Sequence, residues 1–435
     1  MGDMEASLAS KYQRLRSGGR SLPVPGEGEL AALWGGALVR QPLRTGDGRR
    51  VTVLQAGLPE APGALRFVEA ALRFDEGPVK VGVVEIGETV ARGEMPLLTV
   101  IWNGEERGTG AQALVALATQ LPAPWAEMAD LVELPAPAEG SSSLREEAPL
   151  PSGDALSVRL LDLLRAAGLY RLGRRTRRIG LRLAAVGRTQ ALWELLAEAL
   201  GYHRNQEPFR HLARRLPVSF LEPLAEGERT ALLFGVAGFL PAGDFRGIPP
   251  QAQAAARPLW DRWWKARGAL DYTVLPAGAW SFRQIRPANR PERRLAALAQ
   301  LVPHLARLER AIDRRDAAAF ARVLAECHDP FWSRQATWKS RPSPKPIQLI
   351  GGERIDDLVV NLFWPLVALD DPAAAEAAWN DLPGADNRVL RAARERLPAE
   401  FTPGRSLRSS LLQQGLLQLD RDTRETGLGR MLAGW

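Results

Sequence analysis

Cysteine is almost absent from this sequence of 435 residues, and its scarcity excludes several kinds of site. A single thiol, Cys327, permits neither an internal disulfide framework nor a cysteine-rich zinc site. The four histidines include no pair at the HxxxH spacing of a helical metal site. We therefore expect no metal bound by histidine and cysteine, and the low cysteine content fits a reducing cytoplasm.

Long apolar runs are also missing. The longest, such as LVVNLFWPLVAL (358–369), are too short to span a bilayer. The N-terminal stretch MGDMEASLASKYQRLR lacks the apolar segment of a secretory signal, so we expect a cytoplasmic protein with no membrane partner. No GxSxG, Walker A or well-placed GxGxxG motif occurs, so the sequence supports neither a serine hydrolase nor a nucleotide-binding loop.

Positive charge is plentiful but unevenly distributed. Residues 1–150 carry 14 Lys and Arg against 20 Asp and Glu, and the remainder carries 43 against 30. The net charges are therefore −6 and +13, and the basic part could meet a polyanion such as DNA or RNA. The alternative is that the basic charge reflects a general compositional bias and not a binding function, because 52 of the 57 basic residues are arginine in a chain rich in Ala, Gly and Pro.

The sequence pattern predicts an α+β protein, with a small N-terminal mixed α/β sheet domain and a larger all-α domain. β-branched runs separated by turn residues indicate a meander or hairpins in the first part. Its strands are expected at 51–57, 64–74, 79–88 and 96–104, and its helices at 28–40 and 110–119. Apolar residues recur at helical spacing in the second part, where Gly168 and Gly201 are expected to end two helices.

The domain plan follows from these patterns and from one stretch rich in Pro, Ser and Gly. The expected units are a flexible N-terminal tail (1–25), an α/β domain (26–133), a linker (134–154), a helical domain (155–423) and a C-terminal tail (424–435). The expected helices of the second part are 154–168, 188–201, 207–217, 228–240, 291–312, 354–369 and 405–423.

The segment RLGRRTRRIGLRLAAVGR (171–188) contains seven arginines and no acid. Helical spacing would align five of them on one face beside an apolar stripe, which suits contact with a phosphate backbone. These five are Arg171, Arg174, Arg175, Arg178 and Arg182. A solvated face that pairs with the acidic first domain, for example through Glu146 and Glu147, is the equally weighted alternative.

Aromatic and polar residues in the helical part suggest structural roles first. Trp260, Trp263 and Trp264 alternate with basic residues and could stack bases, although their spacing is more typical of an interhelical core. Four further polar side chains lie within or beside apolar helical segments, where we expect caps and buried hydrogen bonds. They are Asn205, Asn289, Arg354 and Asn361.

Seven blocks, in consistent order from about residue 43 to about residue 419, resemble the bacterial domain-of-unknown-function family 2851. The blocks are LRTGDGRRVTVLQAG, GVVEIGE, ALWELLAEALGYHRNQEPFRHLARRLP, ERTALLFGVAGFL, IRPANRPERRLAALA, GGERIDDLVVNLFWPL and SSLLQQGLLQL. The resemblance implies a layout more than an activity. It also implies an N-terminal part similar to a PD-(D/E)XK nuclease core, in which two carboxylates on adjacent strands hold Mg²⁺.

This sequence departs from that pattern at the reactive positions. The family's Pro-Asp-Phe is replaced by Leu65, Arg66 and Phe67, so that a cation stands where an acid is expected. Glu85 is kept, and Arg66 could pair with it if their strands are neighbours. Glu69 could supply a substitute carboxylate only if a bulge interrupts the strand, because positions 66 and 69 otherwise face opposite sides.

We therefore expect a non-catalytic, nuclease-like protein that associates with nucleic acid through the five arginines of the 171–188 segment. Two alternatives remain open. One is a Mg²⁺- or Mn²⁺-dependent nuclease that uses Glu85 with Glu69 or Glu60, and the other is an adaptor whose helical domain binds another protein. No cofactor is expected unless the nuclease alternative holds.

Overall fold

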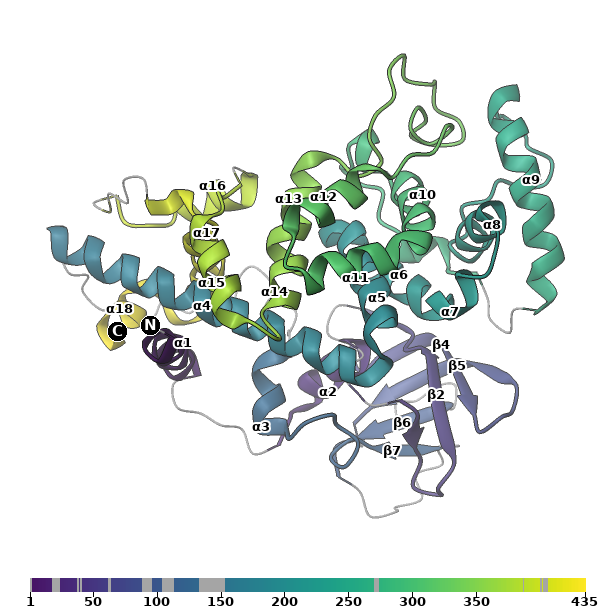
Figure 1. The fold of residues 1–435 in the computed structure, drawn as a ribbon. Coiled ribbons are helices and arrows are strands. Elements are labelled where there is room, and N and C mark those ends of the chain that lie inside the picture. The colour runs from purple at the N-terminus through teal and green to yellow at the C-terminus, as the bar shows by residue number, and fades with distance from the viewer. Residues whose placement is uncertain are drawn as a thin grey trace.

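In the computed structural model, Figure 1 shows a sheet against a larger assembly of helices. The structure describes residues 2–17, 24–36, 39, 41–61, 64–87, 96–103, 113–132, 153–269, 274–385, 387–399, 401 and 406–435. The fold class is α+β, with the sheet in the N-terminal part and helices throughout the remainder, as the sequence predicts. None of the described helices is long and apolar enough to cross a membrane.

The sheet is mixed, and its main path runs β1-β2-β4-β5-β6-β7, with β3 paired to β4. The strands are β1 Leu43–Arg44, β2 Arg50–Gln55, β3 Leu58–Pro59, β4 Arg66–Phe74, β5 Val79–Ile86, β6 Leu98–Ile101 and β7 Leu114–Ala116. Neighbours from β1 to β5 are antiparallel, which confirms the meander or hairpins predicted for 51–57, 64–74 and 79–88. The same prediction is wrong for 96–104, because β6 runs parallel to β5, and β7 runs parallel to β6. The helix predicted at 110–119 is wrong, because Val115 and its neighbours pair with β6 as strand β7.

One face of the sheet packs against helix α2 (Glu27–Gly36) and the short helices α3 (Trp125–Met128) and η1 (Ala129–Leu131). Alternate strand residues such as Phe67 and Val84 share a buried cluster with Leu33 and Trp34 of α2. Burial of each such side chain contributes roughly 1.5–3 kcal/mol. This cluster fixes the register of β4 against β5, and therefore places Arg66 opposite Glu85.

A 34-residue helix, α4 (Gly153–Val186), crosses the molecule from the C-terminal helices to the sheet (Figure 1). The predicted helix end at Gly168 is wrong, because α4 continues through this residue. A Cβ at Gly168 would overlap the carbonyl group of Leu411, and a Cβ at Gly415 would overlap that of Leu164. The two glycines therefore allow α4 and α17 (Ser410–Thr426) to approach closely.

Most of the remaining helices surround a second core that extends from Ile179 to Val367, whereas the last two of them bury Trp379 and Leu390 in separate clusters with residues of α4 and α17. The remaining helices are α5 Arg188–Leu200, α6 Tyr202–Arg215, α7 Val218–Leu221, α8 Glu226–Val236, α9 Pro250–Ala266, α10 Pro291–Leu301, α11 Leu305–Asp313, α12 Ala317–Ala325, α13 Gly352–Leu358, α14 Trp364–Val367, α15 Pro372–Asp381 and α16 Arg388–Arg394. A π-helical turn, η6 (Val359–Phe363), joins α13 to α14. Gly201 follows the last residue of α5, where the sequence places a helix end.

Helices also occupy most of the segments predicted as tails, so the prediction of a flexible N-terminus and a C-terminal tail is wrong. Helix α1 (Gly2–Ser17) packs on α4, and its buried Tyr12 donates a 2.9 Å hydrogen bond to Asp422 of α17. At the other end, α18 (Leu428–Gly434) buries Met431 and Leu432. Apolar side chains of both segments are therefore packed in the core. Most of the predicted linker, residues 134–152, lies outside the described residues.

Candidate functional site

Glu85 is buried in the sheet, where it pairs with Arg66 on the adjacent strand. Its side chain is 5% exposed, and Arg66 NH1 donates a 2.6 Å hydrogen bond to its Oε1. Arg66 also pairs through Nε, at 3.0 Å, with the half-exposed Glu60. The pair expected from the sequence is therefore present, and it places a guanidinium on Oε1 of Glu85, whereas the buried Oε2 has no hydrogen-bond partner among the described residues.

Glu69 lies at the bulge that the sequence requires for it to help Glu85. The register between β4 and β5 shifts between Phe67 and Ala70, and Glu69 has a positive φ of 56°. Its side chain is nevertheless exposed, whereas Glu85 is buried. Among the described residues, no three His, Cys, Asp or Glu side chains are grouped so that they could hold a metal ion. The residues present do not fit the Mg²⁺ site that the nuclease resemblance implies.

The five arginines of α4 all contact other parts of the protein itself. Each reaches a different partner, so they do not form one free face. Arg171 donates to Gln414 of α17, Arg174 to the carbonyl of Asp130, Arg175 to the carbonyl of Asn361, Arg178 pairs with Glu198, and Arg182 pairs with Glu194. These arginines tie α4 to neighbouring helices and to the end of the sheet domain, and phosphate binding by them stays a prediction that their contacts within the chain do not favour. Glu146 and Glu147 lie outside the described residues.

The polar residues expected to be structural lie at junctions between helices and loops. Asn205 donates to the carbonyl of Ser281 at 2.9 Å and accepts from its amide at 2.8 Å. Asn289 Oδ1 accepts hydrogen bonds from Tyr202 and Arg294, at 3.1 and 2.6 Å. These bonds join α6 to the loop before α10.

Arg354 and Asn361 lie further along the chain, at the helices that follow the 326–351 loop. Arg354 lies 4.1 Å over the ring of Tyr202 and pairs with Asp357. Asn361 differs, because its buried Oδ1 has no hydrogen-bond partner among the described residues. Its carbonyl instead accepts the bond from Arg175.

A buried charge cluster joins α4, α5 and α6, and the sequence reasoning missed most of it. Glu194 Oε2 accepts hydrogen bonds from Nε of Arg182 at 2.8 Å and from Nε of Arg214 at 3.3 Å. Gln190 donates to the other oxygen of Glu194 at 2.9 Å. Burial and the nearby charge of Arg182 lower the pKa of Arg214 to about 9. Two guanidinium groups therefore share one oxygen of the Glu194 carboxylate.

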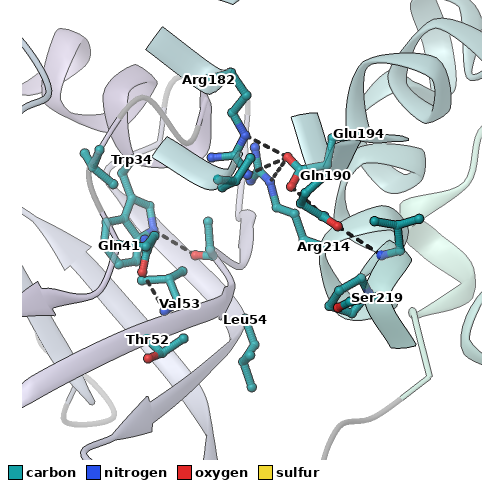
Figure 2. Close-up of a pocket in the computed structure, with 15 residues that line it drawn as sticks. Trp34, Gln41, Thr52, Val53, Leu54, Arg182, Gln190, Glu194, Arg214 and Ser219 are labelled. Atoms are coloured by element: carbon teal, nitrogen blue, oxygen red, sulfur yellow. Dashed lines mark hydrogen bonds and ion pairs between the residues drawn. The ribbon is translucent and has the colours of Figure 1, made fainter. Parts of the chain in front are cut away.

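This cluster closes one end of a cavity of about 440 Å³ between the edge of β2 and the helices (Figure 2). The sheet side is lined by Trp34 and by residues of β2 such as Val53 and Leu54. The helix side is lined by α4, α5 and the start of α7, including Val218. The cavity thus has mainly apolar walls and one cationic end.

A separate surface on the helical part carries exposed cations without acidic partners. It comprises Arg257, Arg262, Lys265, Arg267, Arg283, Arg286, Lys339, Arg341 and Lys345, and we call it the basic surface. None of these nine forms an ion pair with an acid among the described residues. They occupy α9 and the loops before α10 and after α12.

Aromatic contacts hold the segments of the basic surface together. Phe245, which precedes α9, lies 6.4 Å from Trp260, and Phe239 lies 6.0 Å from Phe282. Trp338 donates a 2.7 Å hydrogen bond to the carbonyl of Phe239. The three segments that carry these cations therefore all contact the 239–245 loop.

The tryptophans of 260–268 divide between two environments. Trp263 is buried against Gly235 of α8, in agreement with a core role. Trp264 is 47% exposed, and the guanidinium of Arg267 lies 4.5 Å from its ring centre. One exposed aromatic ring thus lies within the basic surface.

The fold and these sites define an α+β protein with a neutralised acidic position in its sheet and a basic helical part. The profile of a family described as "Protein of unknown function (DUF2851)" matches residues 155–382, which is more than half of the chain. The chain belongs to this family. Comparisons with curated proteins and with solved structures gave no match. The matched range includes α5 to α15, and therefore the basic surface and the helical wall of the cavity.

Proposed function

We propose that this protein associates with nucleic acid through the basic surface, without catalysing its hydrolysis. The observation that carries the proposal is the group of nine exposed cations that lack acidic partners. Cations of this kind release the counterions of a phosphate backbone on binding, and this release drives association. The α4 arginines do not have this freedom, because they contact Gln414, Glu194 and other groups of the same chain.

Exposed rings beside the cations favour single-stranded nucleic acid as the partner. Trp264 and Phe282 are 47% and 39% exposed, which is unusual for side chains of this size. Bases stack on such rings with little sequence preference, while arginines follow the backbone. The basic surface therefore offers both elements of a stacking platform.

The proposed absence of catalysis rests on the pair between Arg66 and Glu85. A guanidinium 2.6 Å from Glu85 Oε1 neutralises the carboxylate and repels a divalent ion. Without that ion no water is activated at this position of a nuclease-like sheet. Incubation of the protein and of Glu85→Ala with labelled DNA or RNA and Mn²⁺ should give identical traces, and cleavage by the wild type alone would contradict this part.

Fluorescence anisotropy with a labelled 20-nucleotide single strand tests the binding. Replacement of Arg262, Arg283 and Arg286 by glutamine should weaken binding at least tenfold, because each removes one phosphate contact. A matched control replaces Arg159, Arg388 and Arg430, which are also exposed but lie on α4, α16 and α18. Equal affinity of the two triple variants for the strand would overturn the proposal. It would also be overturned if the protein did not bind the strand but bound a protein partner in a complex that survives nuclease treatment.

A further inference from the structure

The cavity between β2 and the helices contains a cationic group with unused hydrogen-bonding capacity. Arg214 donates from Nε to Glu194, and its two terminal nitrogens form no hydrogen bond with the described residues. Arg182 shares the same carboxylate oxygen, so that two guanidinium groups face one carboxylate. Glu198, one helical turn further along α5, pairs with Arg210 and Arg178, and the charges of Arg210 and Arg214 help to lower the pKa of Glu207.

We propose that this cavity binds a small organic anion, with an apolar body between the walls and a carboxylate on Arg214. A buried guanidinium presents its terminal nitrogens to a planar carboxylate as a two-pronged donor. Figure 2 shows Arg182 and Arg214 together at one end of the space that separates the sheet from the helices.

The residues that line the cavity indicate the chemistry and the size of the rest of the ligand. Trp34, Val53 and Leu54 on the sheet side, and Val186 and Val218 on the helix side, offer apolar contact surface. A volume of about 440 Å³ lies within the range of cavities that hold small molecules. The site is distinct from the basic surface, because it is lined by α4, α5, α6, α7 and β2 and contains no residue of α9.

Three probes with the same apolar body separate charge recognition from simple apolar binding. These are 4-phenylbutyrate, 4-phenylbutanol and 4-phenylbutylamine, which differ in the charge of one end. In isothermal titration calorimetry of the full chain we expect the carboxylate to bind at least tenfold more tightly than the alcohol, and the amine not to bind. Equal affinities of the three probes, or no binding of the carboxylate, would overturn the proposal.

Two variants locate the binding at this cavity. Arg214→Gln should weaken 4-phenylbutyrate at least tenfold while the protein stays folded, because Arg182 still neutralises Glu194. Ser219→Phe places a large side chain at the lining from an exposed position and should also reduce binding without removing a buried charge. Arg246→Gln, whose side chain is 90% exposed, is the matched control. Unchanged affinity in both cavity variants would place any binding elsewhere and reject the site.

Discussion

Removal of the charge of Arg66 should destabilise the protein much more than removal of an exposed charge in the same sheet. Arg66→Met keeps most of the aliphatic side chain but leaves Glu85, which is 4% exposed, without its partner at 2.6 Å. Loss of one partner from a buried ion pair costs about 3–5 kcal/mol. Because the Arg66 side chain is 19% exposed, we expect the lower end, about 3 kcal/mol.

Urea unfolding followed by circular dichroism measures this cost. The matched control is Arg50→Met, which breaks an exposed pair with Glu76 and should cost less than about 1 kcal/mol. The double variant Arg66→Met/Glu85→Gln removes both charges and should recover at least half of the loss. If Arg66→Met costs no more than Arg50→Met, the inference that Arg66 neutralises a buried carboxylate is refuted.

Two further substitutions test the packing of α4 and the burial of His211. Gly415→Ala should destabilise the protein by about 1–3 kcal/mol or more, because the added Cβ would overlap the carbonyl of Leu164. Gly173→Ala is the control, because no atom lies near its added Cβ, and it should be neutral or stabilising. Thermal unfolding measures both. Equal melting temperatures for these two variants would contradict the close crossing of α4 and α17. Burial lowers the pKa of His211 below its usual value, so the unfolded chain takes up a proton near pH 6.5 that the folded protein resists. The contribution of His211 to the free energy of unfolding should therefore be constant above about pH 6.5 and fall by up to about 1.4 kcal/mol per pH unit towards pH 5. His211→Phe should reduce the slope of the measured profile in this range, and parallel profiles of the two proteins would contradict the reasoning.

The sequence predicts the α+β class and the central strands because local patterns determine them. Strands β2, β4 and β5 are short, mainly apolar runs bounded by turn residues, and the sequence itself shows the cation at position 66. The pairing of Arg66 with Glu85 follows once the two strands are adjacent. Strand β7 is too short for its pattern to be distinguished from a helix, and only its parallel pairing with β6 decides the matter.

The errors in the helical part come from contacts between distant segments. Gly168 and Gly201 look alike in the sequence, yet Gly201 ends α5 and Gly168 accommodates α17, more than 240 residues away. Helical spacing also aligns the arginines of α4, but it does not reveal that other elements of the fold contact each of them.

The charged end of the cavity could have been predicted from the sequence. Gln190, Glu194 and Glu198 are spaced four residues apart on α5, and Arg210 and Arg214 are spaced in the same way on α6. Such spacing predicts one charged face on each helix. The opposite signs of the two faces indicate that they meet. The β2 wall, in contrast, depends on how the sheet docks against the helices, which no local pattern encodes.

The most direct measurement is the salt dependence of single-strand binding. If at least four cations of the basic surface contact phosphates, the logarithm of the association constant should fall with the logarithm of salt concentration at a slope of about −3 or steeper. In the Arg262, Arg283 and Arg286 triple variant, the magnitude of the slope should decrease by about 2. In the Arg159, Arg388 and Arg430 variant, the slope should be unchanged. A slope near zero, or the same slope in all three proteins, would show that the basic surface does not bind nucleic acid.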